Sequence, residues 1–184
     1  MKNKGTHIAA GDAHTCVVIK GRKELKCWGY NAKGQLGRDS TQTWGDSAQQ
    51  MGDYLWYRPF LGTGRTVVGV FSGANAEHTC AILDDGNLKC WGRNTEGQLG
   101  LGDGNNRGDQ ANPYEMGNNL PNVDLGTGKT AVSVAMGLYH TCAILNDGNV
   151  KCWVQRKKIC DLYQPPMLTK SFTTSFNLCS DTHA

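Results

Sequence analysis

The 184-residue chain has no long hydrophobic run and no dominant charge. A membrane-spanning helix needs about 20 consecutive apolar residues, and no stretch here comes near that length, so we expect no membrane span. Residues 1–153 carry 15 Lys and Arg against 14 Asp and Glu, and the formal net charge of the whole chain is +3. Binding of nucleic acid through a basic face requires an excess of Lys and Arg, so we expect no nucleic-acid partner.

A readable secretory signal peptide is also missing. Residues 1–5 are basic, but the apolar segment of about 7–15 residues that a signal peptide needs does not follow them. The N-terminus therefore does not assign the chain to a compartment.

Glycine is absent from the last part of the chain and abundant before it. All 24 glycines lie in residues 1–148, and none lies in residues 154–184. An interior glycine costs a helix about 0.5–1 kcal/mol relative to alanine, so the even spread of glycine over residues 1–148 disfavours long helices. Residues 154–184 differ in composition from the rest, so we expect a non-repeat tail that is disordered or of aberrant origin, such as a frameshift or retained intron. A genuine C-terminal extension is the alternative.

What the sequence does contain is a repeat. The tripeptide His-Thr-Cys begins at His14, His78 and His140, with spacings of 64 and 62 residues. Lys-Cys-Trp also occurs three times and Gly-Gln-Leu-Gly twice, in the same order. Within each unit, alternating β-branched residues predict short strands, for example at 130–135, 141–145 and 149–153. A period near 63 residues with about four short strands is typical of one blade of a β-propeller.

Two polar, Gly- and Asn-rich stretches, at about 38–60 and 101–124, interrupt the strand pattern and are predicted to be loops. Loops carry binding function more often than strands do, and aromatic side chains on loops are good anchors for a partner. Packing of these aromatic rings onto the blade beneath them is the alternative. The candidate partner-binding residues are Trp44, Tyr54, Trp56, Tyr57 and Tyr114.

The cysteines of the repeat fall opposite one another in predicted hairpins. With a three-residue loop at residues 84–86, Cys80 faces Cys90, and the same count pairs Cys142 with Cys152. Such a non-hydrogen-bonded pair has Cα atoms about 4.5 Å apart, which is within disulfide range. A loop that is one residue longer, at residues 20–23, pairs Cys16 with Cys27.

Three interpretations of these cysteines stay open. They form one hairpin disulfide per repeat, they are buried reduced thiols, or each pair joins the nearby histidine, such as His78 beside Cys80, as metal ligands. A Cys-x9-Cys spacing is unusual for a metal site, and we favour disulfides. Disulfides would favour an extracellular or lumenal compartment, with the cytoplasm as the alternative.

These motifs resemble the repeat of the regulator of chromosome condensation family. That repeat has a Gly before His-Thr, then a hairpin, then Trp-Gly-x-Asn and Gly-Gln-Leu-Gly, which correspond here to residues 137–141, 91–94 and 97–100. The resemblance covers about residues 8–153, and the cysteine-bearing form looks like a divergent branch of the family. It implies a seven-bladed β-propeller fold.

The resemblance implies less about function. The family includes a guanine-nucleotide exchange factor for the small GTPase Ran, ubiquitin-ligase targeting domains, a plant ultraviolet photoreceptor and inhibitors of β-lactamases. Because these members share a rigid disc that binds another protein, we predict a non-catalytic protein–protein interaction module. The alternative is a guanine-nucleotide exchange factor-like regulator of a small GTPase. An enzyme on a propeller scaffold has no residue in its favour.

The repeats occupy too little chain for a closed ring. Residues 1–153 hold about two and a half repeats, whereas a propeller needs at least four blades. We therefore expect an all-β, open partial propeller, a fragment of about 2.5 blades of four-stranded antiparallel sheet. Open strand edges pair with other chains, so the expected partners are proteins of unknown identity, including further copies of this chain.

No other motif assigns a catalytic, cofactor or metal site. The histidines recur once per repeat, as do Trp28, Trp91 and Trp153, and residues that recur in this way serve the packing of the blade. Residues 62–66 and 126–130 lack the spacer of a phosphate-binding loop, and Arg107-Gly108-Asp109 is a match that composition alone produces.

Overall fold

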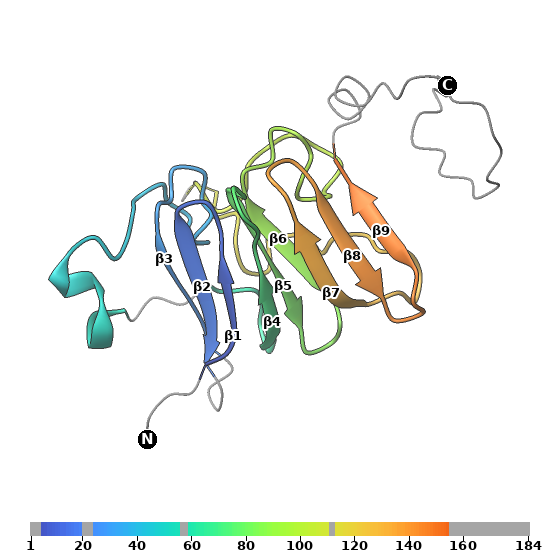
Figure 1. Cartoon of the computed structure of the whole chain (residues 1–184), viewed down its shortest axis with the longest axis horizontal. Helices are drawn as coiled ribbons and strands as arrows, with labels where there is room; N and C mark the ends of the chain where they lie inside the picture. The colour runs from blue at the N-terminus through green and yellow to red at the C-terminus, as the bar shows by residue number, and fades with distance from the viewer. Residues whose placement is uncertain (1–4, 20–23, 56–58, 111–112, 155–184) are drawn as a thin grey trace. The chain divides into compact units, whose positions relative to one another are not determined.

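The computed structural model describes residues 5–19, 24–55, 59–110 and 113–154. These residues form an all-β fold of three antiparallel sheets, each made of three strands that are consecutive in sequence. Figure 1 shows the sheets side by side in chain order, the first in blue, the second in green and the third in orange. The strands are β1 (Gly5–Ala10), β2 (His14–Ile19), β3 (Glu24–Gly29), β4 (Val67–Phe71), β5 (His78–Leu83), β6 (Leu88–Gly92), β7 (Ala131–Met136), β8 (Thr141–Leu145) and β9 (Val150–Trp153).

The second hairpin of each sheet has the predicted register. Between β5 and β6 the N–H of Leu83 donates to the Asn87 carbonyl at 2.9 Å, and Gly86 adopts a φ of +80° in the turn. That φ lies in the left-handed region, where glycine is unstrained. Counting back from the turn, Cys80 lies opposite Cys90, and the same register pairs Cys142 with Cys152 in the third sheet.

The described sheets have three strands, whereas the sequence predicted four. After the third strand, the chain continues as a Gly- and Asn-rich loop that returns to the sheet at a single residue. Gly29 pairs with Trp44 in this way, and Gly92 with Arg107. Pairing at one residue does not make a strand, because the polar segments around it offer no alternating apolar face to bury. The all-β, unclosed propeller fold is otherwise the one predicted.

The hydrophobic core lies between successive sheets, so strands β5 and β6 of the middle sheet are buried on both faces. One cluster fills the space between the first and second sheets, and a second fills the space between the second and third. Alternate residues of β5 divide between them: Ala81 and Leu83 face the first cluster, and Cys80 and Ile82 face the second. The blades are therefore held together mainly by apolar burial across their faces.

The third sheet leaves the corresponding face uncovered within the described residues. Ile82 and Leu88 of the second sheet are 5% and 0% exposed, whereas their equivalents, Ile144 and Val150, are 46% and 61% exposed. Residues 155–184, which include most of the predicted tail, lie outside the described part of the chain, so the tail stays a prediction. No helix in the described part is long and apolar enough to cross a membrane.

Candidate protein-interaction surface

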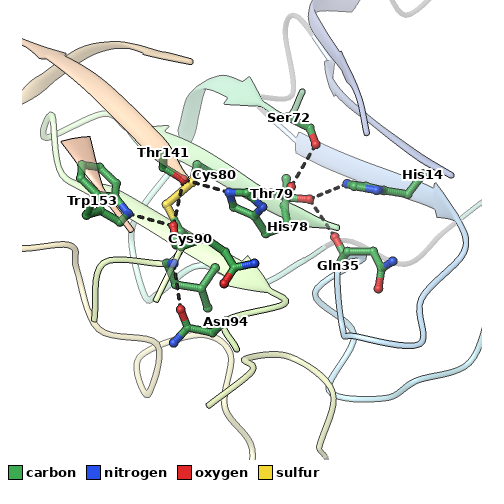
Figure 2. The surroundings of a disulfide bond; sticks show 12 residues. His14, Gln35, Ser72, His78, Thr79, Cys80, Cys90, Asn94, Thr141 and Trp153 are labelled. Carbon is green, nitrogen blue, oxygen red and sulfur yellow. Dashed lines mark hydrogen bonds between the residues drawn. A yellow bond between two sulfur atoms is a disulfide. The ribbon is translucent and has the colours of Figure 1, made fainter. Parts of the chain in front are cut away.

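The repeated histidines form bonds between blades. His14 Nε2 lies 2.8 Å from the Oγ1 of Thr79 in the next sheet, and that hydroxyl donates to the backbone carbonyl of Gln35 at 2.9 Å. The third sheet repeats the arrangement, since His78 contacts Thr141, which donates to Gln98. Figure 2 shows both histidines pointing toward the threonine of the following blade.

These contacts fix the tautomer of the histidine. The single hydroxyl proton of Thr79 is donated to the Gln35 carbonyl, so the Nε2–H of His14 is the donor in the His–Thr bond. Nδ1 then has no proton, and it is buried with no partner among the described residues. Burial lowers the pKa of His14 to about 4 and that of His78 to about 3. Both side chains are therefore neutral at pH 7 and structural.

The repeated tryptophans bind the same carbonyls. Trp91 Nε1 donates to the Gln35 carbonyl at 3.0 Å, and Trp153 Nε1 to that of Gln98 at 2.8 Å. The carbonyl that accepts both bonds belongs to the Gly-Gln-Leu-Gly loop of the preceding blade. Each junction thus joins a histidine and a loop carbonyl from one blade to a threonine and an indole from the next.

The Asn side chain of the Trp-Gly-x-Asn motif and the Gln side chain of the loop itself hold the Gly-Gln-Leu-Gly backbone in place. Asn94 accepts the N–H of Leu99 at 2.9 Å through Oδ1, while its Nδ2 donates to the Asp103 carbonyl at 2.9 Å. The side-chain oxygen of Gln98 accepts the N–H of Glu96 at 2.9 Å. Asn31 and Gln35 do the same in the first repeat. The loop backbone is thereby positioned to accept the bonds from the following blade.

The three cysteine pairs are joined in the structure. The bonds are Cys16–Cys27, Cys80–Cys90 and Cys142–Cys152, with Cα separations of 4.1, 4.1 and 4.0 Å. The first two lie in the cores between blades, whereas Cys152 is exposed. No group of three or more metal-ligating His, Cys, Asp or Glu side chains comes together in the parts of the chain that are described.

The candidate partner-binding aromatics have different surroundings. Trp44 is half-buried against the first core, and the guanidinium carbon of Arg38 lies 4.0 Å from its ring centroid. Tyr54, at the end of the short 3-10 helix η2 (Gly52–Tyr54) that follows η1 (Ala48–Gln50), is 60% exposed, and Tyr114 is 65% exposed. Trp56 and Tyr57 lie outside the described residues.

The two long loops predicted to carry function meet in the structure. Oδ1 of Asp39 accepts the N–H groups of Glu115 and Met116 at 2.9 and 3.0 Å, and the N–H of Ser40 donates to the Gly108 carbonyl at 3.1 Å. The N–H of Gly108 in turn donates to a carboxylate oxygen of Glu115 at 2.9 Å. The loops that follow the first and second sheets therefore form one continuous surface.

A hollow of about 370 Å³ opens in this surface. Its lining includes Phe60, which is 52% exposed, and Tyr114. The sequence does not point to Phe60, because its importance depends on the fold that places residues 60 and 114 together. The full lining of this Phe60–Tyr114 hollow is Asp39, Phe60, Tyr114, Met116, Asn118 and Asn119.

A second, polar hollow of about 540 Å³ lies on the loop that follows the second sheet and includes Asp109 and Glu115 in its lining. Burial raises the pKa of Glu115, and the neighbouring carboxylate of Asp109 raises it further, while the N–H of Gly108 opposes the change. Asp109 also accepts the side-chain amide of Asn106 at 3.0 Å. This side of the surface therefore carries carboxyl groups.

The repeat itself decides the family. The regulator of chromosome condensation (RCC1) repeat matches residues 6–35 and 67–98 in one form and residues 85–144 in another. The chain belongs to the RCC1 repeat family. The histidine, threonine and tryptophan contacts described above thus link successive RCC1 repeats.

Known RCC1-type proteins resemble the chain over most of its length. A Protein RCC2 homolog from Xenopus laevis is 29% identical over an alignment of 177 positions, which covers 84% of this chain and 31% of that protein. The human WBSCR16 structure has a TM-score of 0.59 at 22% identity and covers 89% of this chain and 37% of that one. Yeast RCC1 (Prp20), solved bound to Kap60, has a TM-score of 0.55 at 20% identity over 83% of this chain and 30% of that one.

The structural likenesses show the β-propeller fold alone, since the identities are low. The chain spans about a third of the length of the relative and the structures described above. What those whole proteins do is therefore a separate question from what these repeats do.

Proposed function

We propose that the chain is a non-catalytic protein-interaction module whose partner binds the surface formed by loops 38–60 and 101–124. The observation that carries this proposal is the meeting of the two loops through Asp39, which builds a firm surface with exposed Tyr114 and Phe60 on rigid blades. Rigid aromatic anchors lose little conformational freedom on binding, so such a surface suits a protein partner.

The repeated polar residues support a binding role over an enzymatic one. Both buried histidines donate their Nε2–H to a threonine, and the basic nitrogen that is left, Nδ1, is itself buried and out of reach of a substrate. They hold blades together and recur once per repeat. The complex of yeast RCC1 with Kap60 is an example of a protein bound by a related propeller.

The test is a pull-down from an extract of the source organism with the immobilised full chain. A Tyr54→Ser/Tyr114→Ser variant removes two exposed loop aromatics, and Val132→Ser, also exposed but on strand β7, is the matched control. We expect a stoichiometric partner that the chain and the control retain and the loop variant loses. Equal recovery by all three proteins would contradict a role for the loops.

The same preparation addresses the alternative of a regulator of a small GTPase. Purified chain is mixed with Ran loaded with a fluorescent guanine nucleotide, and nucleotide release is followed over time. We expect no acceleration of release above the buffer rate. Acceleration that scales with chain concentration would replace the present proposal with an exchange activity.

The disulfides also bear on the compartment in which the chain works. We propose an extracellular or lumenal location, because three bridged cysteine pairs persist best in an oxidising environment.

A further inference from the structure

The walls of the Phe60–Tyr114 hollow are aromatic and come from two loops. The ring of Phe60 lies against the backbone of Gly117, since a Cβ on that glycine would be 2.4 Å from Phe60 Cδ1, and the N–H of Gly117 donates to the Phe60 carbonyl at 2.8 Å. Tyr114 is held on the other loop, where its carbonyl accepts the side-chain amide of Asn119 at 2.8 Å. The backbone bonds at Phe60 and Tyr114 thereby place two exposed aromatic residues at one hollow.

Most hydrogen-bond donors at this site are used inside the protein. The amide nitrogens of Asn118 and Asn119 donate to the Thr63 hydroxyl and the Tyr114 carbonyl. The backbone N–H groups of residues 115, 116, 117 and 119 donate to Asp39, to Phe60 and to Met116. An incoming group that offered only acceptors would find few donors left to bind.

Acceptors, in contrast, remain available. Asp39 uses Oδ1 for the backbone of the opposite loop, and its Oδ2 has no hydrogen-bond partner among the described residues. The side-chain oxygen of Asn119 likewise has none among them, since only its nitrogen is bonded. A carboxylate oxygen, an amide oxygen and two aromatic faces together favour a cationic group that donates several hydrogen bonds.

The charges around the hollow agree with this preference. Glu115 adjoins Asp39 through its backbone, and Asp109 adjoins Glu115. Lys89 donates to the Gly117 carbonyl at 2.8 Å, but its side chain is buried in the blade and it does not line the hollow. Arg107 is paired with Asp103 at 2.6 Å. The groups that line the hollow include one carboxylate and no cation.

We propose that the Phe60–Tyr114 hollow binds an arginine side chain of the partner protein. The planar guanidinium would stack on the aromatic rings and donate to Asp39 Oδ2 and the Asn119 amide oxygen, which a point-charge ammonium does less well. The volume of about 370 Å³ is at the small end for a ligand site, which fits a single side chain better than a nucleotide or large cofactor. This inference rests on the proposed function, because it names the chemistry that the loop surface recognises.

The experiment is an NMR titration of the full-length, disulfide-bonded chain, labelled with ¹⁵N, using N-acetyl-arginine amide. The neutral isostere N-acetyl-citrulline amide and the ammonium analogue N-acetyl-lysine amide are run in parallel. We expect saturable shifts confined to residues 114–119 and to Asp39 and Phe60, with a Kd on the order of 1 mM, as befits one side chain. Citrulline should bind at least about 10-fold more weakly, and lysine about 3-fold more weakly.

Variants separate the site from general surface effects. Tyr114→Ser should weaken arginine binding about 2- to 5-fold, the range measured for exposed cation–π contacts. Asp39→Asn keeps Oδ1 for the loop backbone and removes the charge, so it should weaken binding more. Val132→Ser, a similarly exposed residue of strand β7 outside the hollow, is the control and should leave the Kd unchanged.

Equal binding of arginine and citrulline, or shifts that Asp39→Asn leaves intact, would overturn the proposal. So would lysine binding as tightly as arginine. Failure here is distinguishable from failure of the proposed function. If the pull-down partner still binds the chain and is lost on loop substitution, the loops bind protein by other chemistry. If the pull-down also shows no dependence on the loops, the proposed surface itself is wrong.

Discussion

At the scale of single residues, the buried histidines make stability depend on pH. Their pKa values in the folded chain, about 4 for His14 and about 3 for His78, lie below the usual 6.5. Below pH 6.5 the unfolded chain therefore binds more protons than the folded chain does, and lowering the pH favours unfolding. Their contribution to stability is complete above pH 6.5 and is lost as pH drops toward the folded values. Between pH 7 and pH 5 we expect each histidine to remove about 2 kcal/mol of stability.

The measurement is a series of urea unfolding curves at pH 7, 6 and 5. His78→Gln keeps a donor for Thr141 but does not titrate, so it should roughly halve the loss of stability between pH 7 and pH 5. Val132→Ser, an exposed substitution on strand β7 that leaves every histidine in place, should keep the full loss. An unchanged pH dependence in His78→Gln would contradict the assignment.

The cysteines give a second prediction at this scale. Alkylation of the unfolded chain without reductant, followed by intact mass, should add at most two labels, because six of the eight cysteines are bridged. Six or more labels would rule out the hairpin bridges. Under mild reductant in the native state, Cys142 and Cys152 should be labelled first, because Cys152 is exposed whereas Cys16, Cys80 and Cys90 are fully buried.

The sequence predicted which residues lie opposite each other within a repeated hairpin. It did not predict the contacts between residues that only the fold brings together. The opposition of Cys80 and Cys90 follows from the turn residues alone. The bond from His14 to Thr79 could not be predicted, because it joins residues that are 65 positions apart. Phe60 was missed for the same reason, since only the structure places it beside Tyr114.

At the scale of the elements, the hairpin turns allow a matched comparison. Gly86 and Gly148 adopt φ values of +80° and +83° in equivalent turns. A Cβ on Gly86 would lie 2.6 Å from the Cβ of Thr130, whereas one on Gly148 would meet no atom within 4 Å. Alanine at either site is strained by about 1–2 kcal/mol, but only Gly86→Ala must also displace the neighbouring segment.

We therefore expect Gly86→Ala to lower the free energy of unfolding by at least about 1 kcal/mol more than Gly148→Ala, as measured by urea unfolding. Equal effects of the two substitutions would mean that residue 130 moves away without cost and that the turn does not hold the next blade. The Ala131 N–H, which donates to the Gly86 carbonyl at 3.0 Å, is the bond that such movement would disturb.

The strands themselves were the most predictable elements. The predicted segments 141–145 and 149–153 match β8 (Thr141–Leu145) and β9 (Val150–Trp153) within a residue. Their alternation of apolar residues reflects burial on a sheet face. The predicted fourth strand is absent from the first two sheets. After Gly29 and Gly92, backbone N–H groups donate to Asn and Gln side chains within the loops instead of to the backbone of a neighbouring strand.

At the scale of the whole molecule, the bonds between blades should make the repeats cooperate. Thr79→Val removes the hydroxyl that joins His14 to Gln35 without changing the size of the side chain. Leaving a buried donor and a carbonyl with fewer partners costs about 1–3 kcal/mol. Thr15→Val, at the equivalent half-buried position of the first blade, should cost less than about 0.5 kcal/mol.

The check is urea unfolding of both variants, together with a double-mutant cycle between positions 14 and 79. A coupling energy near zero would show that the blades are held by apolar packing alone. A positive coupling would place the His–Thr bond among the contacts that make the repeats unfold together.

The uncovered face of the third sheet predicts self-association of the isolated chain. Ile144 and Val150 are exposed where the equivalent residues of the second sheet are buried by a neighbouring blade. Sedimentation velocity over a range of concentrations should show oligomers, and Ile144→Lys should reduce them. Val68→Lys, at a similarly exposed residue of β4, should not. A single monomer boundary at all concentrations would contradict this expectation.

The junction between blades has a direction. The histidine and the loop carbonyl always come from the earlier blade, and the threonine and the indole from the later one. Two copies of the same face therefore cannot reproduce these bonds with each other, so a two-fold symmetric dimer cannot form through them. Copies joined by this chemistry would add head to tail, and such growth ends only when the rotation from one copy to the next closes a ring.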